Sequence, residues 1–303
     1  MLELQKITID DKEMFDRFLK RKCSRNSEFT FTNLFMWRKS YDICYLIIDD
    51  MLCIMPQHKG SARSATFPIG FMTEDGGEYD IRPVIETLIR QAEEEKREFL
   101  LRLYDNKTVD RLVTAFPGRF FITEDVNYFD YVYRVADLVQ LSGKRYHAKK
   151  NFVNRFQKSY DWEYQRLSAE NAGECLELFA RWSQKEDGDA ESIAEEAEAV
   201  RELFENWDAL GVRGGCLRVD GAMVAFSVGE PLCEDTVVIH LEHADTDYVG
   251  AFAMMNQQFL AHEWQDYTYV NREEDMGIPG LRKAKESYRP AFMVKKYVAT
   301  LMP

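Results

Sequence analysis

The sequence has no long apolar run, so it predicts no helix that spans a membrane. Its apolar stretches are short, such as residues 45–48, whereas a spanning helix needs about 20 apolar residues. The N-terminal residues, MLELQKITIDDKEMF, also lack the basic segment and following apolar segment of a secretory signal. We therefore predict a cytoplasmic protein without an integral membrane segment.

Paired cysteine motifs are absent as well. The six cysteines are scattered and form no Cys-x-x-Cys motif, which disfavours a disulfide framework and a zinc site. His240, Glu242 and His243 lie close together in a predicted strand, but alternation directs His243 to the opposite face from the other two. We predict no metal site; His240 and Glu242 either form cross-strand pairs or line a substrate cleft.

The chain does contain enough apolar material for a large core. It has 303 residues, of which 46% are hydrophobic and 13% aromatic. A chain of this length buries about three quarters of its unfolded surface, and it usually forms one large or two medium domains.

Two parts of the sequence share one order of predicted elements. Residues 41–56 predict a hairpin that turns at 49–50, and residues 216–228 predict one that turns at 220–221. In each part a helix, a strand, a second helix, a proline and a final strand follow, and the last of these strands is predicted at 292–298. This repeated order predicts a divergent duplication of a mixed α/β unit.

Charge is unevenly distributed along the chain. The net charge is −13, yet residues 138–160 contain no acid. A helix over this segment would align Lys144 and Arg155 in one stripe and place Phe152 and Phe156 on an apolar side. Such a stripe can bind phosphates of a nucleic acid, a nucleotide or a lipid headgroup, or it can pair with acidic surface elsewhere. The basic residues of the segment are Lys144, Arg145, His147, Lys149, Lys150, Arg155 and Lys158.

Residues 267–290 predict a strand, a polar loop and a cationic helix in immediate succession. Gly277 permits a tight turn in the loop, and Pro279 suits the first turn of the helix. Acids and bases in one short segment are typical of either a salt-bridged helix entry or a functional site. The candidate side chains are Asn271, Glu274, Asp275, Arg282, Lys283 and Lys285.

Two motifs carry a family resemblance. Residues 127–156, NYFDYVYRVADLVQLSGKRYHAKKNFVNRF, and residues 271–290, NREEDMGIPGLRKAKESYRP, closely resemble paired signatures of an uncharacterised bacterial family. That family is related to the C-terminal domain of phosphatidylglycerol lysyltransferases and, more distantly, to the Fem-type aminoacyltransferases. The element order likewise resembles a tandem GNAT-like acyltransferase fold. We expect an α/β protein with mixed α+β sheets and two GNAT-like halves, 1–140 and 141–303, the second carrying the site.

The resemblance implies transfer of an acyl or aminoacyl group from a polyanionic carrier to an amine or hydroxyl acceptor. In the characterised relatives the carrier is aminoacyl-tRNA. The acceptor is expected to be a small molecule, a lipid headgroup or a peptide. The implied reaction is direct attack in a ternary complex, without metal, tightly bound cofactor or covalent intermediate, by a monomer or a dimer.

Such a reaction needs a proton acceptor, stabilisation of the carbonyl oxygen and a hold on the carrier. Glu274 or Asp275 is expected to accept a proton or bind the acceptor amine, and Lys283 to meet a phosphate or a developing oxyanion. No single residue is assigned as the general base. The residues expected to bind substrate or carrier are Lys144, Arg145, His147, Lys149, Lys150, Arg155, Glu242, Gly250, Asn271, Arg282 and Lys285.

One turn departs from the enzymes of this fold that use acetyl-coenzyme A. Those enzymes hold the pyrophosphate at a helix start with Gln or Arg, two residues, Gly, one residue and then Gly or Ala. Here Asp247, Gly250 and Phe252 take those three positions. A carboxylate beside a pyrophosphate is unfavourable, so a coenzyme A-dependent N-acyltransferase is an alternative function. A non-catalytic ligand-binding module on the same fold is the other alternative.

Overall fold

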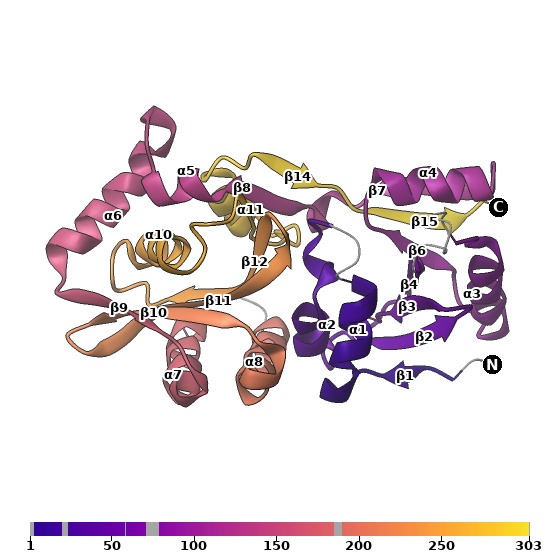
Figure 1. Ribbon diagram of the computed structural model, residues 1–303, viewed down its shortest axis with the longest axis horizontal. Coiled ribbons are helices and arrows are strands. Elements are labelled where there is room, and N and C mark those ends of the chain that lie inside the picture. Colours follow the sequence, from indigo (N-terminus) through magenta and orange to yellow (C-terminus); the bar gives the residue numbers. More distant parts are fainter. Residues whose placement is uncertain (1–2, 20–23, 58, 71–78, 185–189, 303) are drawn as a thin grey trace. The chain divides into compact units, whose positions relative to one another are not determined.

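The computed structural model describes residues 3–19, 24–57, 59–70, 79–184 and 190–302 (Figure 1). The chain forms two compact units. Unit 1 comprises Met1–Lys22, Glu28–Phe129 and Val294–Pro303, and unit 2 comprises Cys23–Ser27 and Asp130–Met293. The boundary expected after residue 140 falls inside unit 2, and the division into duplicated halves stays a prediction.

In the part of the chain that the structure describes, unit 1 contains two four-stranded sheets. One has the order β1 (Gln5–Lys6), β2 (Cys44–Ile48), β3 (Met51–Met55) and β5 (Ile69–Gly70). The other has the order β4 (Ala65–Thr66), β6 (Leu100–Leu103), β15 (Tyr297–Leu301) and β7 (Phe120–Glu124). The α-helices are α1 (Lys12–Leu19), α2 (Phe31–Trp37), α3 (Arg82–Glu94) and α4 (Asn106–Ala115).

Unit 2 is built on a seven-stranded mixed sheet. Its order is β14 (Phe292–Val294), β8 (Asp130–Arg134), β13 (Tyr269–Asn271), β12 (Thr236–Ala244), β11 (Ala222–Cys233), β10 (Arg213–Val219) and β9 (Trp162–Arg166). β12 and β13 are parallel, whereas β9 to β12 form an antiparallel ladder. The α-helices are α5 (Val135–Gln140), α6 (His147–Ser159), α7 (Ala172–Ser183), α8 (Ala190–Glu205), α9 (Trp207–Leu210), α10 (Ala251–Glu263) and α11 (Pro279–Glu286).

Both predicted hairpins are confirmed. β2 and β3 pair around Asp49 and Asp50, whose φ angles are 48° and 59°. β10 and β11 pair around Asp220 and Gly221, with φ angles of 50° and 82°. Positive φ at both central residues is typical of the two-residue turns that match the twist of a hairpin.

The single strand predicted at 292–298 is wrong. The chain forms two strands there, interrupted at Lys295 and Lys296. β14 lies next to β8 in the sheet of unit 2, whereas β15 pairs with β6 and β7 in unit 1. Lys296 is buried, and its Nζ lies 3.1 Å from Glu28 Oε1. A partly buried ion pair therefore marks the point where the chain leaves one sheet for the other.

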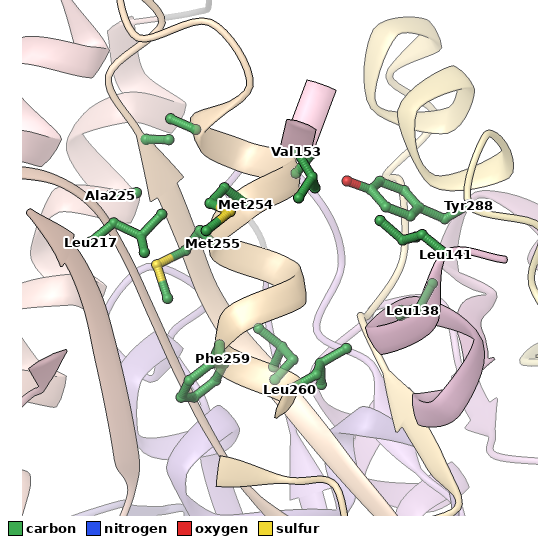
Figure 2. Close-up of a cluster of buried hydrophobic side chains, with 14 of the residues drawn as sticks. Leu138, Leu141, Val153, Leu217, Ala225, Met254, Met255, Phe259, Leu260 and Tyr288 are labelled. Atoms are coloured by element: carbon green, nitrogen blue, oxygen red, sulfur yellow. The ribbon is translucent and has the colours of Figure 1, made fainter. Parts of the chain in front are cut away.

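The core of unit 2 lies around α10. This helix packs against α5 and α6 and against one face of the sheet, while α7 and α8 lie on the other side (Figure 1). Figure 2 shows Met254 and Phe259 of α10 between Leu217 of the sheet and a group that contains Val153 and Tyr288. Because α10 is apolar around most of its circumference, it fills the space between these layers. The packing fixes Tyr288, which follows α11, beside α6.

The predicted apolar side of the basic helix is only partly right. α6 begins at His147, after a 3-10 turn over Lys144–Tyr146. Its buried face contains Val153 and Phe156, whereas Phe152 is 46% exposed. Neighbouring helical residues point about 100° apart, so a helix that buries Val153 turns Phe152 toward solvent. The expectation that Phe152 shares an apolar side with Phe156 is therefore wrong.

Candidate functional site

His240 and Glu242 project from one face of β12, as strand alternation predicts. The register between β11 and β12 shifts at Val228 and Gly229, and this bulge leaves His240 without a directly paired residue. Bulges re-aim the side chain that they contain. Here the side chain is aimed into the interior of unit 2.

His240 is held between two carboxylates. Its Nε2 lies 3.0 Å from Glu230 Oε1, and its Nδ1 lies 3.0 Å from Glu273 Oε1. Complete burial lowers the pKa of His240, but the two carboxylates act against burial and raise the pKa to about 9. The ring is therefore an imidazolium at neutral pH and donates to both neighbours.

Asn271 fixes the backbone at the start of the loop after β13. It is fully buried, and its Oδ1 accepts a hydrogen bond of 2.7 Å from Glu273 N. Its Nδ2 donates to Arg25 O at 2.7 Å and to Asp130 Oδ2 at 2.8 Å. These bonds support a left-handed φ of 55° at Glu273, so that its carboxylate reaches His240.

Asp275 fixes the other end of the loop. Its carboxylate accepts hydrogen bonds from Tyr131 Oη at 2.6 Å, from Gly277 N at 2.8 Å, and from Arg282 Nε and Nη2 at 2.8 and 2.9 Å. Burial raises the pKa of Asp275, but these donors outweigh burial and hold the pKa below its usual range. The carboxylate therefore stays ionised and ties the loop to α11.

Arg272 lies between these two anchors and faces Glu242. Its Nη2 donates to Glu242 Oε1 at 2.7 Å, and Asn256 Nδ2 donates to Glu242 Oε2 at 3.0 Å. Both oxygens of Glu242 are thus engaged. The guanidinium carbon of Arg272 lies 4.7 Å from the centroid of the Tyr288 ring.

Lys285 extends from α11 beneath the same loop. Its Nζ donates to the carbonyl oxygens of Arg272 and Glu273. Burial and the charge of Arg272 lower the pKa of Lys285 to about 8, against the opposing charges of Glu273, Glu274 and Asp130. An amine with this pKa is partly neutral near physiological pH.

Lys149 brings the basic segment to this cluster. Its Nζ lies 3.9 Å from the centroid of the Tyr288 ring. Burial and the charge of Arg272 lower the pKa of Lys149 to about 8, although Glu242 acts in the opposite direction. The two segments selected from the sequence therefore meet at one tyrosine ring.

A separate pocket lies on the outer side of the basic segment. Its volume is about 500 Å³. Lys144, His147 and Lys150 line it together with Asn151 and Asn154. The consecutive residues Lys149 and Lys150 thus lie on different surfaces of α6. Lys149 faces the cluster, and Lys150 faces the pocket. No residue of 271–290 lines this pocket.

Other candidates are placed outside both groups. Lys283 is exposed on α11 and Arg155 is exposed on α6. Arg145 donates to Asp137 Oδ2 at 2.8 Å. Glu274 is partly exposed, and its charge acts on Lys285. The roles of all these residues stay predictions.

Gly250 has a packing role. Its φ is 94°, and a Cβ there would lie 2.4 Å from Phe152 O. The start of α10 is therefore pressed against the backbone of α6. Val249 N, which precedes this helix start, donates to Tyr160 Oη at 3.3 Å.

Several side chains of the cluster were not selected from the sequence. Arg272 and Glu273 lie in the loop after β13. Glu230 lies on β11, and Tyr288 follows α11. Arg272 and Glu273 lie between the candidates Asn271 and Glu274, directly after a predicted strand. That position could have marked them as site residues. No feature of the sequence marks Glu230 or Tyr288 as a site residue. Only the tertiary fold brings Glu230 to His240 and Tyr288 to Lys149.

His243 lies on the opposite face, as predicted. Its Nε2 is 3.2 Å from Glu196 Oε1, and Phe179 and Trp182 pack against its ring. Among the residues that the structure describes, no group of three or more His, Cys, Asp or Glu side chains can hold a metal ion. Within the same residues, no helix is both long and apolar enough to cross a membrane.

The sequence matches a known family. The family model described as "Phosphatidylglycerol lysyltransferase, C-terminal" matches residues 20–300. A conserved protein of unknown function from Bacteroides thetaiotaomicron, with a solved crystal structure, is 36% identical; the match covers 100% of both chains with a TM-score of 0.88. An uncharacterised protein of Mycoplasmoides gallisepticum is 24% identical over 178 residues, 57% of this chain and 56% of that protein. The match thus spans little more than half of that relative.

More distant solved structures show the fold. L-PGS from Bacillus licheniformis has a TM-score of 0.66 at 16% identity, over 99% of this chain and 94% of its own. FemX has a TM-score of 0.61 at 9% identity, over 99% of this chain and 98% of its own. A tandem GNAT protein from the clavulanic acid biosynthesis pathway has a TM-score of 0.54 at 10% identity, over 100% of this chain and 99% of its own. The predicted fold class, an α/β protein with a tandem GNAT-like acyltransferase fold, is confirmed.

Proposed function

The chain belongs to the phosphatidylglycerol lysyltransferase C-terminal family, and we propose that it is a cytoplasmic enzyme that transfers an acyl or aminoacyl group, with aminoacyl-tRNA as the favoured donor. The acceptor is an amine or hydroxyl of a small molecule, a lipid headgroup or a peptide. The observation that carries the proposal is the cluster of Lys149, Glu242 and Arg272 at Tyr288 together with Lys285, which bonds to the backbone of Arg272; both lysines have lowered pKa values.

The proposed reaction is a direct substitution at the ester carbonyl of the donor. The nitrogen or oxygen of the acceptor forms a bond to the carbonyl carbon, and the ester bond to the carrier hydroxyl breaks. The acceptor loses one proton, and the departing oxygen gains one. No covalent enzyme intermediate or metal is required, but a group that accepts and returns a proton is.

Lys285 is suited to that proton transfer. A neutral amine has two N–H bonds and one lone pair, and the carbonyl oxygens of Arg272 and Glu273 take two donated hydrogens. The lone pair then remains to accept the proton of the attacking group. The pKa of about 8 makes this neutral form accessible near physiological pH.

Asp275 and Glu274, the two acids predicted as catalytic, have different roles in this proposal. Asp275 accepts hydrogen bonds from Tyr131, Gly277 and Arg282, so its oxygens are engaged and it is a weak base. We assign it the task of holding the loop. Glu274, at the partly exposed edge of the loop, is the better candidate for binding an acceptor amine.

The polyanionic carrier is assigned to the outer surface of the basic segment. Lys144, His147 and Lys150 line an open pocket there, and Arg155 extends the positive surface along α6. Phosphate contacts of this kind position a nucleic acid without reading its sequence. Binding of the carrier should therefore weaken steeply as salt is raised.

Coenzyme A is the less favoured donor. In enzymes that use it, free backbone N–H groups at a helix start hold the pyrophosphate. The corresponding start of α10 has Gly250 packed against Phe152 O, and Val249 N already donates to Tyr160. The carboxylate of Asp247 adds an unfavourable charge beside that helix start.

A donor assay tests the proposal. The purified chain is incubated with tRNA charged with radiolabelled amino acids, or with labelled acetyl-coenzyme A, together with metabolite and lipid extracts. We expect label to leave tRNA and to appear in a product that contains no tRNA, with no transfer from acetyl-coenzyme A; a base-stable product indicates an amine acceptor and a base-labile product indicates a hydroxyl acceptor. Transfer from acetyl-coenzyme A alone would favour the coenzyme A-dependent alternative. Binding of neither donor would favour a non-catalytic module.

A further inference from the structure

Arg272 interacts with Glu242 and with the Tyr288 side chain, but one nitrogen of its guanidinium group makes no hydrogen bond to the residues that the structure describes. Nη2 donates to Glu242 Oε1 at 2.7 Å, but Nη1 is buried and has no hydrogen-bond acceptor among the described residues. Buried donors without a partner are uncommon in native structures and call for an explanation such as a missing ligand or water. The guanidinium carbon of Arg272 lies 4.7 Å from the centroid of the Tyr288 ring.

Lys149 is a second cation without a direct counterion at the same place. Within the described residues its Nζ donates no hydrogen bond and forms no ion pair, and it lies 3.9 Å from the centroid of the Tyr288 ring. Glu242 is the carboxylate that acts on it. Both oxygens of Glu242 already accept hydrogen bonds, from Arg272 and Asn256. Glu242 is thus already shared between two donors, and it forms no ion pair with Lys149 in the structure.

The two cations lie at the same aromatic ring and repel each other. The charge of Arg272 contributes to the lowered pKa of Lys149, after burial. Lys149 is partly exposed, so a ligand can reach it from solvent. An anion placed between the two groups would remove the repulsion and satisfy the unpaired N–H.

We propose that Lys149 Nζ and Arg272 Nη1 together bind one anionic oxygen group of a substrate, a phosphate or a carboxylate, against the ring of Tyr288. Arg272 offers one free nitrogen rather than a two-pronged fork, and Lys149 is a compact point charge, so the site binds a single oxyanion without imposing planar geometry. The site deepens the proposed transfer function by giving one substrate an anionic group, but binding itself requires no transfer step.

The pH dependence has a definite sign. The charged and titratable groups that face Lys149 are Arg272, Glu242 and Tyr288. Lys149 binds an anion in its protonated form, and its pKa in the free protein is about 8. Affinity should therefore be constant well below pH 8 and fall about tenfold per pH unit above it. By the same linkage, a bound anion raises the pKa of Lys149.

The test uses two probes, dimethyl phosphate and acetate, each singly charged at every pH used. The full chain carries ¹³C-labelled lysine, and the Lys149 resonance is followed by NMR from pH 6 to pH 10 with and without the probe. Chloride at equal ionic strength is the control. We expect one or both probes to raise the pKa of Lys149 by at least about half a unit; the more effective probe identifies the oxyanion as phosphate or carboxylate.

Three variants sharpen the result. Lys149→Met keeps an apolar stem over Tyr288 and should weaken probe binding by more than about tenfold. Arg272→Lys keeps a cation for Glu242 but removes Nη1, and should also weaken binding. Lys158→Met, which changes an exposed lysine in the last turn of α6, is the control and should leave binding unchanged. Thermal unfolding verifies that each variant folds.

Two results would overturn the proposal. One is an unchanged Lys149 pKa in the wild-type chain with both probes, which needs no variant. The other is equal weakening by Lys149→Met and Lys158→Met, which would indicate diffuse attraction to α6. Neither result bears on the donor assay, and a failed donor assay would leave the anion measurements standing.

Discussion

Lys149 and Lys285 are kept in places that lower their pKa values to about 8. A lysine whose pKa is lower in the folded than in the unfolded chain opposes folding at neutral pH. Two such residues beside one arginine are a destabilising arrangement, and strongly perturbed pKa values of this kind are typical of functional sites. His240 behaves in the opposite way, because its two carboxylate neighbours stabilise its charged form.

His240 predicts a pH-dependent stability. Its folded pKa of about 9 lies above the ordinary histidine value of 6.5, so its contribution is complete below about pH 6.5 and is lost as pH rises through 9. The contribution is at most about 3 kcal/mol. Chemical denaturation of His240→Gln from pH 6 to pH 9.5 should lack this decline, whereas His262→Gln, at an exposed histidine, should retain it. An unchanged decline in His240→Gln would contradict the assignment.

At the scale of elements, local patterns were predictable and long-range pairing was not. The turns at 49–50 and 220–221 carry their own backbone preferences, and alternation correctly separated His240 from His243. Residues 292–298 were predicted to form a single strand because the residues of both parts favour a strand. The local sequence contains no information about which sheet each part joins. Arg272 was missed although it directly follows a predicted strand, because its partner Glu242 comes near it only in the folded chain.

The contact between α6 and α10 depends on Gly250. Its φ is 94°, and a Cβ added there would lie only 2.4 Å from Phe152 O, which leaves no room for a side chain. Gly250→Ala should lower the free energy of unfolding by at least about 2 kcal/mol. Gly280→Ala, on α11 with nothing within 4 Å of the new methyl group, is the control and should be neutral or stabilising. Equal stability of the two variants in urea titrations would argue against this packing role.

At the scale of the whole molecule, the C-terminal strand belongs to the sheet of unit 1. β15 lies between β6 and β7, and Ala299 is completely buried there. The strand follows the segments that form the candidate site in unit 2. The chain is therefore continuous between the site and a strand that unit 1 needs for its second sheet.

Removal of residues 295–303 tests this dependence. Loss of an interior strand leaves the backbone groups of β6 and β7 that face β15 without partners, although β6 keeps its pairing with β4. Hydrogen exchange should show lost protection in β6 and β7 and retained protection in β10, β11 and β12. Unchanged protection of β6 and β7 would show that β15 is dispensable.

The most direct measurement of the central claim is the rate of aminoacyl transfer from charged tRNA as a function of pH in two lysine variants. The wild-type rate should rise to a plateau above about pH 8, where Lys285 is neutral. Lys285→Met should be about 100-fold slower and should lack this rise. Lys107→Met, which changes an exposed lysine of α4 in unit 1, is the control and should behave as wild type. Wild-type rate and pH profile in a folded Lys285→Met variant would contradict the account.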